Sequence, residues 1–197
     1  MALYQVVQER TGYDTYLVIG GDNLMTLSLG EMLELHYRTG KPVVAAYTLR
    51  DVREASRYGV IESTVDGTIA RLVEKPRNPK SNLIAACCYA LPAATPKLLE
   101  EYLEAEGKPD APGYFIEWLV HREQTLAYRF KGIWYDIGTP RAYLEANMAL
   151  TKHMISENAR VEGSPTSESM IESGAHIVAS TAQSSYIGHE ARVYDIR

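Results

Sequence analysis

The sequence predicts an α/β domain followed by a short segment with a different repeat. Short apolar runs alternate with longer segments whose apolar residues recur at helical spacing, which indicates strands connected by helices. Such connections favour a mostly parallel sheet. Toward the carboxyl terminus, aliphatic residues instead recur at intervals of six and ten residues. We therefore expect an α/β domain at residues 1–155 and a separate repeat segment at 156–197.

Composition excludes several classes of function. The chain has 197 residues, 46% of them hydrophobic, which is enough to bury a core. The net charge of -5, without any Lys/Arg-rich run, argues against a nucleic-acid partner. No apolar run approaches the roughly 18 residues that span a membrane, and no signal-peptide pattern is present, so we expect a cytoplasmic protein. Cys87 and Cys88 are adjacent, which suits small buried hydrophobes better than a disulfide or a metal site.

The first apolar run, Tyr16–Ile19, ends on Gly20, Gly21 and Asp22. It predicts a buried strand of a parallel sheet, and the glycines allow a sharp turn where the strand stops. Ligands bind at the carboxyl edge of open α/β sheets, so Asp22 is a candidate ligand-facing acid. The alternative is that Asp22 caps the amino terminus of the next helix. This stretch alone leaves both interpretations open.

Helices are expected at residues 1–10 and 24–40, and a second strand at 43–49. Residues 1–10 have helical spacing but no capping residue before them. The pattern of residues 24–40 stops at Gly40, which precedes Pro42. The second strand is expected to be buried, and the order strand, helix, strand predicts a right-handed crossover.

A hairpin is predicted around Asp66–Gly67, which separates two alternating segments. Its second arm ends in Glu74 and Lys75, just before Pro76, which cannot continue a central strand. Two opposite charges therefore lie at a strand end. Taken alone, they indicate an exposed ion pair of little energetic value.

The same patterns continue through the rest of the α/β domain. They predict strands at 81–91 and 125–130, and helices at 94–107 and 112–123. Thr139 can cap a further helix at 142–155, with Pro140 at its first position. Asp136 precedes this helix. Two acids, Asp22 and Asp136, thus each lie where a strand gives way to a helix.

The carboxyl-terminal segment has a spacing of 10, 6, 10 and 6 residues between successive aliphatic positions. These are Val161, Ile171, Ile177, Ile187 and Val193. This pattern is typical of a left-handed parallel β-helix, whose coils stack aliphatic residues inward. The alternative is a loose polar tail, because residues 164–169 are rich in Ser, Thr and Glu. An uncapped coil has an exposed strand edge, so we expect that a homo-oligomer can form.

Five short motifs follow one another along the chain. They are Ile19-Gly-Gly-Asp-Asn23, Tyr58-Gly-Val-Ile-Glu62, Val73-Glu-Lys-Pro76, Ser81-Asn82 and Trp134-Tyr-Asp-Ile-Gly-Thr-Pro140. In this order they resemble the sugar-1-phosphate nucleotidyltransferases, most closely the glucose-1-phosphate thymidylyl- or uridylyltransferase branch. The resemblance covers about residues 1–150. It implies a Rossmann-like sheet, of which this chain holds the carboxyl-terminal portion, followed by the start of the β-helix.

The resemblance also implies site residues. Asp22 and Asp136 match the two carboxylates that hold a catalytic Mg²⁺, an ion typically bound by one or two carboxylates together with substrate phosphates. Lys75 matches the base that contacts the sugar phosphate, and Glu74 the acid that accepts sugar hydroxyls. The other substrate-contacting positions are Gly21, Asn23, Gly59, Asn82, Cys87 and Trp134.

The implied substrates are a nucleoside triphosphate, dTTP or UTP, and a sugar 1-phosphate, in particular glucose 1-phosphate. A sugar-phosphate oxygen attacks the α-phosphorus in line, and pyrophosphate leaves with the formation of a nucleotide sugar. Such a transfer depends on positioning and charge neutralisation, which agrees with the lack of a Ser/His or Cys/His nucleophile pattern.

Two features depart from the family's pattern. No glycine-rich G-x-G-x-R loop, which cradles the triphosphate, occurs in this chain. In the family it would precede Met1, so we expect little activity from the chain alone. Cys87 stands where the family usually has glycine, which leaves the identity of the sugar open. The alternatives are a non-catalytic subunit that binds nucleotide sugar, and a metal-dependent glycosyltransferase, which the lack of an Asp-x-Asp motif disfavours.

Overall fold

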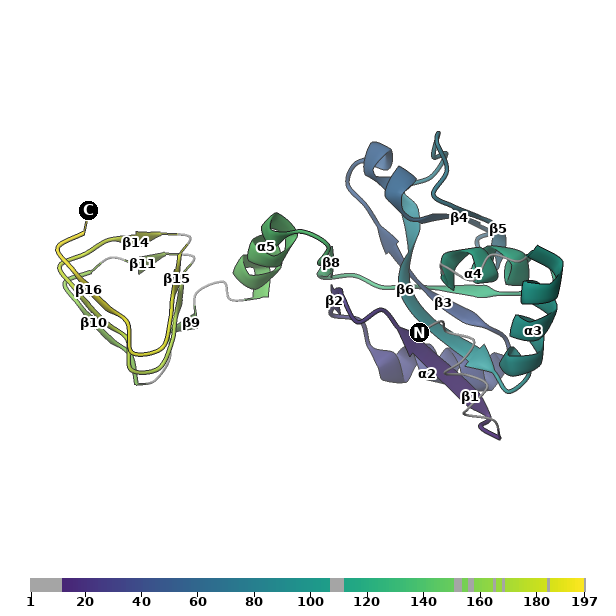
Figure 1. Cartoon of the computed structure of the whole chain (residues 1–197), viewed down its shortest axis with the longest axis horizontal. Coiled ribbons are helices and arrows are strands. Elements are labelled where there is room, and N and C mark those ends of the chain that lie inside the picture. The colour runs from purple at the N-terminus through teal and green to yellow at the C-terminus, as the bar shows by residue number, and fades with distance from the viewer. Residues whose placement is uncertain are drawn as a thin grey trace. The chain divides into compact units, whose positions relative to one another are not determined.

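A computed structural model of the chain (Figure 1) has two compact units, residues 1–134 and 135–197. The structure describes residues 12–106, 112–150, 154–155, 158–164, 166–167, 169–183 and 185–196. The helix predicted at residues 1–10 lies outside them. The division after Trp134 precedes the domain boundary expected at residue 155. No helix in the described part of the chain is long and apolar enough to cross a membrane.

The first unit contains a six-stranded sheet with the order β5-β4-β6-β3-β7, in which β1 also pairs with β6. The strands are β1 (Thr15–Ile19), β3 (Val43–Thr48), β4 (Gly59–Ser63), β5 (Ile69–Glu74), β6 (Leu83–Pro92) and β7 (Leu126–Arg129). In this order β6 lies between β4 and β3.

The prediction of a mostly parallel sheet is wrong for this unit. Strands β1, β3 and β4 all pair with β6 in the antiparallel sense, and β4 pairs with β5 likewise. Only the β3–β7 ladder is parallel among the described strands of the sheet. The hairpin β4–β5 leads into β6 through residues 75–82, which contain no crossover helix, so no parallel connection is imposed on the central strand.

Strand β1 is half-buried, not fully buried as predicted. Tyr16 packs in the core, and Val18 packs against it. The alternating residues Leu17 and Ile19 are 38% and 45% exposed. Successive side chains of a strand point to opposite faces, and only one face of β1 is covered in the described structure. An apolar run was therefore not sufficient to predict burial on both faces.

Helix α2 (Leu29–Thr39) begins later than the predicted residue 24. Its capping residue is Ser28, whose Oγ accepts a hydrogen bond from the Glu31 N–H at 3.3 Å. The helix ends at Gly40, which has a left-handed conformation, as the sequence predicted. Because Ser28 provides the cap, the interpretation of Asp22 as the N-cap is excluded.

Two cores cover the two faces of the sheet. One contains Ile61 and Leu72 of the hairpin together with Phe115 and Leu119 of α4 (Pro112–Val120). The other includes Met32 of α2.

The remaining elements of this part of the chain are η1 (Val52–Arg57), α3 (Thr95–Glu106) and two short strands. These strands, β2 (Asn23–Met25) and β8 (Trp134–Asp136), pair with each other. The predicted hairpin and the strands and helices at 43–130 are confirmed.

The second unit begins after Trp134 and contains α5 (Pro140–Leu150) and three stacks of short parallel strands. Thr139 caps α5 as predicted, because its Oγ1 accepts a hydrogen bond from the Ala142 N–H at 3.1 Å. The prediction that this helix continues to residue 155 is wrong, because α5 ends at Leu150 and Met154–Ile155 form a strand that pairs with Met170–Ile171. The strands are β9 (Met154–Ile155), β10 (Arg160–Glu162), β11 (Thr166–Ser167), β12 (Met170–Ile171), β13 (His176–Val178), β14 (Ala182–Gln183), β15 (Tyr186–Ile187) and β16 (Arg192–Tyr194).

The stacked strands explain the 10-and-6 spacing of the sequence. Val161 pairs with Ile177, and Ile177 with Val193, so two intervals make one coil. Ile171 and Ile177 are buried inside, and Figure 1 shows the strands as sides of a triangular coil. The left-handed β-helix itself stays a prediction.

Serines stabilise the corners of these coils. Ser164 Oγ accepts a hydrogen bond from the Ser180 N–H, and Ser180 Oγ accepts one from the Ile196 N–H, each at 3.1 Å. Ser169 accepts in the same way from the Ser185 N–H. The Ser-rich composition that suggested a loose tail thus includes serines that connect one coil to the next.

Candidate functional site

The site is organised around Cys87, where β6 leaves its regular course. β4 pairs with β6 at Ile84, and β1 pairs with β6 from Cys88 onward, so Cys87 lies between the two pairings. Its φ of 49° is left-handed, a conformation that costs a non-glycine residue roughly 1–2 kcal/mol. The Cys87 carbonyl accepts a hydrogen bond from the Gly20 N–H at 2.8 Å. Such a conformation, held by its surroundings, is typical of functional sites.

Glu74 lies at the end of β5, in a space left by two glycines. It pairs with Gly59 across the hairpin, and a Cβ on Gly59 would lie 2.9 Å from Glu74 Oε2. A Cβ on Gly113 of α4 would collide with the same carboxyl group. The Glu74 side chain is only 9% exposed, and the Lys75 ammonium lies 3.8 Å from its Oε1. Glu74 and Lys75 are therefore not the fully exposed ion pair that their sequence alone indicated.

Burial raises the pKa of the Glu74 carboxyl group. The neighbouring Lys75 charge lowers this pKa, and the charge of Glu117 on α4 raises it. Lys75 is the half-exposed partner, and its backbone is left-handed with a φ of 49°. A buried carboxyl group beside a more exposed cation can accept hydrogen bonds from hydroxyl groups while the cation meets an anion.

Tyr89 belongs to the same cluster, although sequence reasoning missed it. Burial raises its pKa well above the ordinary value, and the nearby Cys87 and Glu74 raise it further. Tyr89 follows Cys87 by two positions on β6, a spacing that places side chains on the same face of a regular strand. That spacing was the available sequence signal. Glu117 and Gly113 gave no comparable signal, because they reach Glu74 from a separate helix.

Asp22 lies on the β1 side of Cys87 and is held by a short hydrogen-bond relay. The Asn23 amide donates to Asp22 Oδ1 at 2.8 Å, and the Trp134 indole N–H donates to Asn23 Oδ1 at 3.0 Å. Trp134 is buried, with its ring edge-on to Tyr58 at 5.0 Å between centroids. A Cβ on Gly20 would lie 3.0 Å from Cys87 Sγ and 3.3 Å from Asp22 Oδ1. The Asp22 carboxylate is therefore exposed but oriented, close to Cys87.

Three predicted site residues stand apart from these clusters. Asn82 uses its amide to donate to the Leu49 carbonyl at 2.7 Å, which ties the start of β6 to the chain after β3. Gly21 lies exposed in the turn before Asp22. Asp136 is half-buried at the end of β8 and belongs to the second unit, so its pairing with Asp22 stays a prediction. Within the described ranges, no three His, Cys, Asp or Glu side chains gather as a metal cluster.

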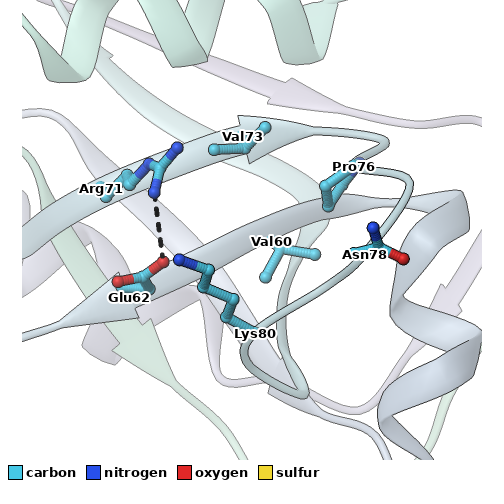
Figure 2. A pocket seen from close by; sticks show the side chains of 7 residues that line it. All are labelled: Val60, Glu62, Arg71, Val73, Pro76, Asn78 and Lys80. Atoms are coloured by element: carbon cyan, nitrogen blue, oxygen red, sulfur yellow. Dashed lines mark ion pairs between the residues drawn. The ribbon is translucent and has the colours of Figure 1, made fainter.

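A separate small pocket lies on the face of the β4–β5 hairpin that is opposite to Glu74 (Figure 2). Its volume is about 70 Å³, below the roughly 300–1,000 Å³ typical of ligand sites. It is lined by Val60, Glu62, Arg71, Val73, Pro76, Asn78 and Lys80. The Arg71 guanidinium lies 3.9 Å from the Glu62 carboxylate, so this cation of the pocket already has a counter-charge. The cluster around Glu74 and Cys87 is the better candidate site.

Comparison with known proteins identifies the family to which this chain is similar. A family model described as nucleotidyl transferase matches residues 1–153. Glucose-1-phosphate adenylyltransferase of Bacillus subtilis (strain 168) is 33% identical over 159 residues, which cover 77% of this chain and 41% of that protein. The protein of the same name from Thermomicrobium roseum is 35% identical over 147 residues, which cover 72% of this chain and 33% of that protein. The chain thus spans less than half the length of these relatives. As its five motifs predicted, the chain belongs to the nucleotidyl transferase family.

Proposed function

We propose that this chain carries the sugar-phosphate part of a sugar-1-phosphate nucleotidyltransferase site and binds glucose 1-phosphate. The observation that carries the proposal is the buried Glu74 carboxyl group beside the half-exposed Lys75 ammonium, in space left by Gly59 and Gly113. The carboxyl group accepts hydrogen bonds from sugar hydroxyls, and the ammonium binds the sugar phosphate. Both relatives are named glucose-1-phosphate adenylyltransferase, which supports glucose 1-phosphate as the substrate.

The relatives' names also bear on the nucleotide. Both are adenylyltransferases, which supports ATP in place of the dTTP or UTP that the motif resemblance implied. We therefore propose ADP-glucose as the nucleotide sugar that the whole protein would make.

The chemistry is an in-line displacement at phosphorus. An oxygen of the sugar phosphate forms a bond to the α-phosphorus of the triphosphate, and the bond from that phosphorus to the bridging oxygen of pyrophosphate breaks. Lys75 holds the attacking phosphate and offsets its charge, while Glu74 fixes the sugar. Catalysis of this kind consists of positioning and electrostatic stabilisation, so no covalent nucleophile is required.

The chemistry of Asp22 suits its proposed role as a ligand of Mg²⁺. Its carboxylate is exposed and its orientation is set by Asn23, and hard carboxylate oxygens are what Mg²⁺ prefers. Asp136 is the proposed second ligand. When bound, Mg²⁺ would neutralise charge on the triphosphate.

Direct binding tests the proposal. Calorimetric titration of the purified 197-residue chain with glucose 1-phosphate should show saturable binding that Lys75→Ala weakens about tenfold or more. Lys80→Ala is the matched control, because Lys80 lines the pocket on the opposite face. Equal affinity of the Lys75→Ala variant and the wild type would contradict the site.

A second candidate function is that of a non-catalytic subunit that binds nucleotide sugar. Glu74 and Lys75 would supply its contacts to the sugar phosphate. Pyrophosphate release from ATP and glucose 1-phosphate tests this second function. We expect little release by this chain alone, and robust release would exclude the non-catalytic role.

A further inference from the structure

The main chain of Glu74 lies at an open edge of the sheet. β5 is the terminal strand of the order β5-β4-β6-β3-β7. The next residue, Lys75, donates its N–H to the Tyr58 carbonyl at 3.0 Å, toward β4. Successive N–H groups of a strand point to opposite sides, so the Glu74 N–H points outward, where no strand of the described sheet accepts it. A half-buried N–H group of this kind needs another acceptor.

Glu117 of α4 supplies that acceptor. Its Oε2 accepts the Glu74 N–H at 3.0 Å, across 43 positions of the chain. The first turn of the same helix lies against the Glu74 carboxyl group, because a Cβ on Gly113 would collide with it. Helix α4 therefore holds both the main chain and the side chain of Glu74, one through Glu117 and the other through Gly113.

We propose that Glu117 is a positioning residue for the sugar-phosphate site, which acts on the substrate only through Glu74. The inference rests on the proposed function of Glu74. Glu117 does two separable things: its oxygen fixes the end of β5, from which both Glu74 and Lys75 project, and its negative charge faces the Glu74 carboxyl group.

The charge effect has a definite sign. The groups that interact electrostatically with Glu74 are Lys75, Glu117 and Tyr89. Burial raises the pKa of Tyr89 well above its usual range, so its phenol is neutral at the pH values where carboxyl groups titrate. Removal of the Glu117 charge leaves Lys75 as the nearby charge and thus lowers the pKa of Glu74. Glu74 then stays ionised, and able to accept from two hydroxyls, at lower pH.

Two substitutions at one position separate the effects. Glu117→Gln keeps an oxygen acceptor and removes the charge, whereas Glu117→Leu removes both. Glu123→Gln is the matched control, because Glu123 is exposed beyond the end of α4. The measurements are the affinity of the full chain for glucose 1-phosphate as a function of pH, by calorimetry, and the titration of the Glu74 carboxyl carbon by NMR, assigned with Glu74→Gln.

We expect Glu117→Gln to bind almost as tightly as the wild type near neutral pH and to keep its affinity to lower pH, with the Glu74 titration midpoint moved in the same direction. Glu117→Leu should bind about tenfold more weakly or worse at every pH. Glu123→Gln should change neither measurement. A purely structural role of Glu117 would leave the titration midpoint of Glu74 unmoved in Glu117→Gln, and that result would overturn the proposal.

The outcomes also distinguish this inference from the proposed function. If the wild-type chain does not bind glucose 1-phosphate, the proposed function is wrong, and so is the role of Glu117 in substrate binding. The NMR titration still decides whether Glu117 acts on Glu74. If Glu117→Leu does not fold, Glu117→Gln alone gives the decisive comparison of midpoints.

Discussion

Trp134 donates its indole N–H to the side-chain oxygen of Asn23 at 3.0 Å, although 111 positions separate the two residues in the chain. The Asn23 amide in turn donates to Asp22 at 2.8 Å. The orientation of an exposed acid at the end of β1 is therefore set by a buried aromatic residue on β8. Asn23 also fills the space beside Gly20, where a Cβ would lie 2.7 Å from its Nδ2.

Trp134→Phe tests this relay. Phenylalanine keeps an aromatic ring against Tyr58 but has no N–H, so the Asn23 oxygen loses its donor. We expect a loss of about 1–3 kcal/mol in the free energy of unfolding, measured with denaturant. NMR should show the Asn23 amide resonances shifted. Tyr47→Phe, which removes only the bond from Tyr47 to the Gly132 carbonyl, is the control for generic loss of a hydrogen bond. Unchanged Asn23 resonances in Trp134→Phe would contradict the relay.

Gly113→Ala should destabilise the chain and weaken glucose 1-phosphate binding together. The added methyl group would collide with the Glu74 carboxyl group, and overpacking of this kind costs about 1–3 kcal/mol. Gly30→Ala, early in α2, is the matched control, since a Cβ there contacts only Ser28 Oγ at 4.0 Å. That control should gain about 0.5–1 kcal/mol from helix propensity. Thermal unfolding and calorimetry check both variants, and a stabilised Gly113→Ala would disprove the predicted collision.

Cys87→Gly and Cys87→Ala together measure the backbone strain at the site. Both remove the thiol, but only glycine relieves the left-handed conformation. After allowance for the greater freedom of glycine in the unfolded chain, we expect the glycine variant to be more stable than the alanine variant by up to about 1 kcal/mol. Urea unfolding gives the comparison. A glycine variant clearly less stable than alanine would show that Cys87 carries no strain.

The burial of Glu74 should make the free energy of unfolding depend on pH. Burial raises its pKa in the folded state above the ordinary 4.5, so the folded state binds the proton more tightly than the unfolded chain. The stability contributed by the protonated form is complete below 4.5 and is lost as the pH rises through the folded-state pKa. Glu74→Gln should remove this decline. Unfolding free energies measured across that window in both proteins test the sign, and an identical slope would refute it.

The sequence by itself determined the local elements and the family. Asp66–Gly67 sets the hairpin, Gly40 ends α2 and Thr139 caps α5, because turn and cap preferences act within a few residues. The five motifs also predicted the nucleotidyl transferase family, which the comparisons confirmed. The motifs also pointed to Glu74, Lys75 and Gly59, which the structure places beside one another, but their role in binding a substrate stays a prediction.

Only the tertiary structure decided how these elements face one another. The antiparallel course of β6, the exposed face of β1 and the Ser28 cap of α2 all differ from what apolar patterns indicated. The burial of Glu74 and its contacts with Glu117 and Gly113 join segments about forty positions apart, and the Trp134–Asn23 bond spans 111. A sequence pattern records which face of an element is apolar, but not which distant side chain completes the hydrogen bonds of a strand edge. That choice is made by packing, and here it places α4 over Glu74.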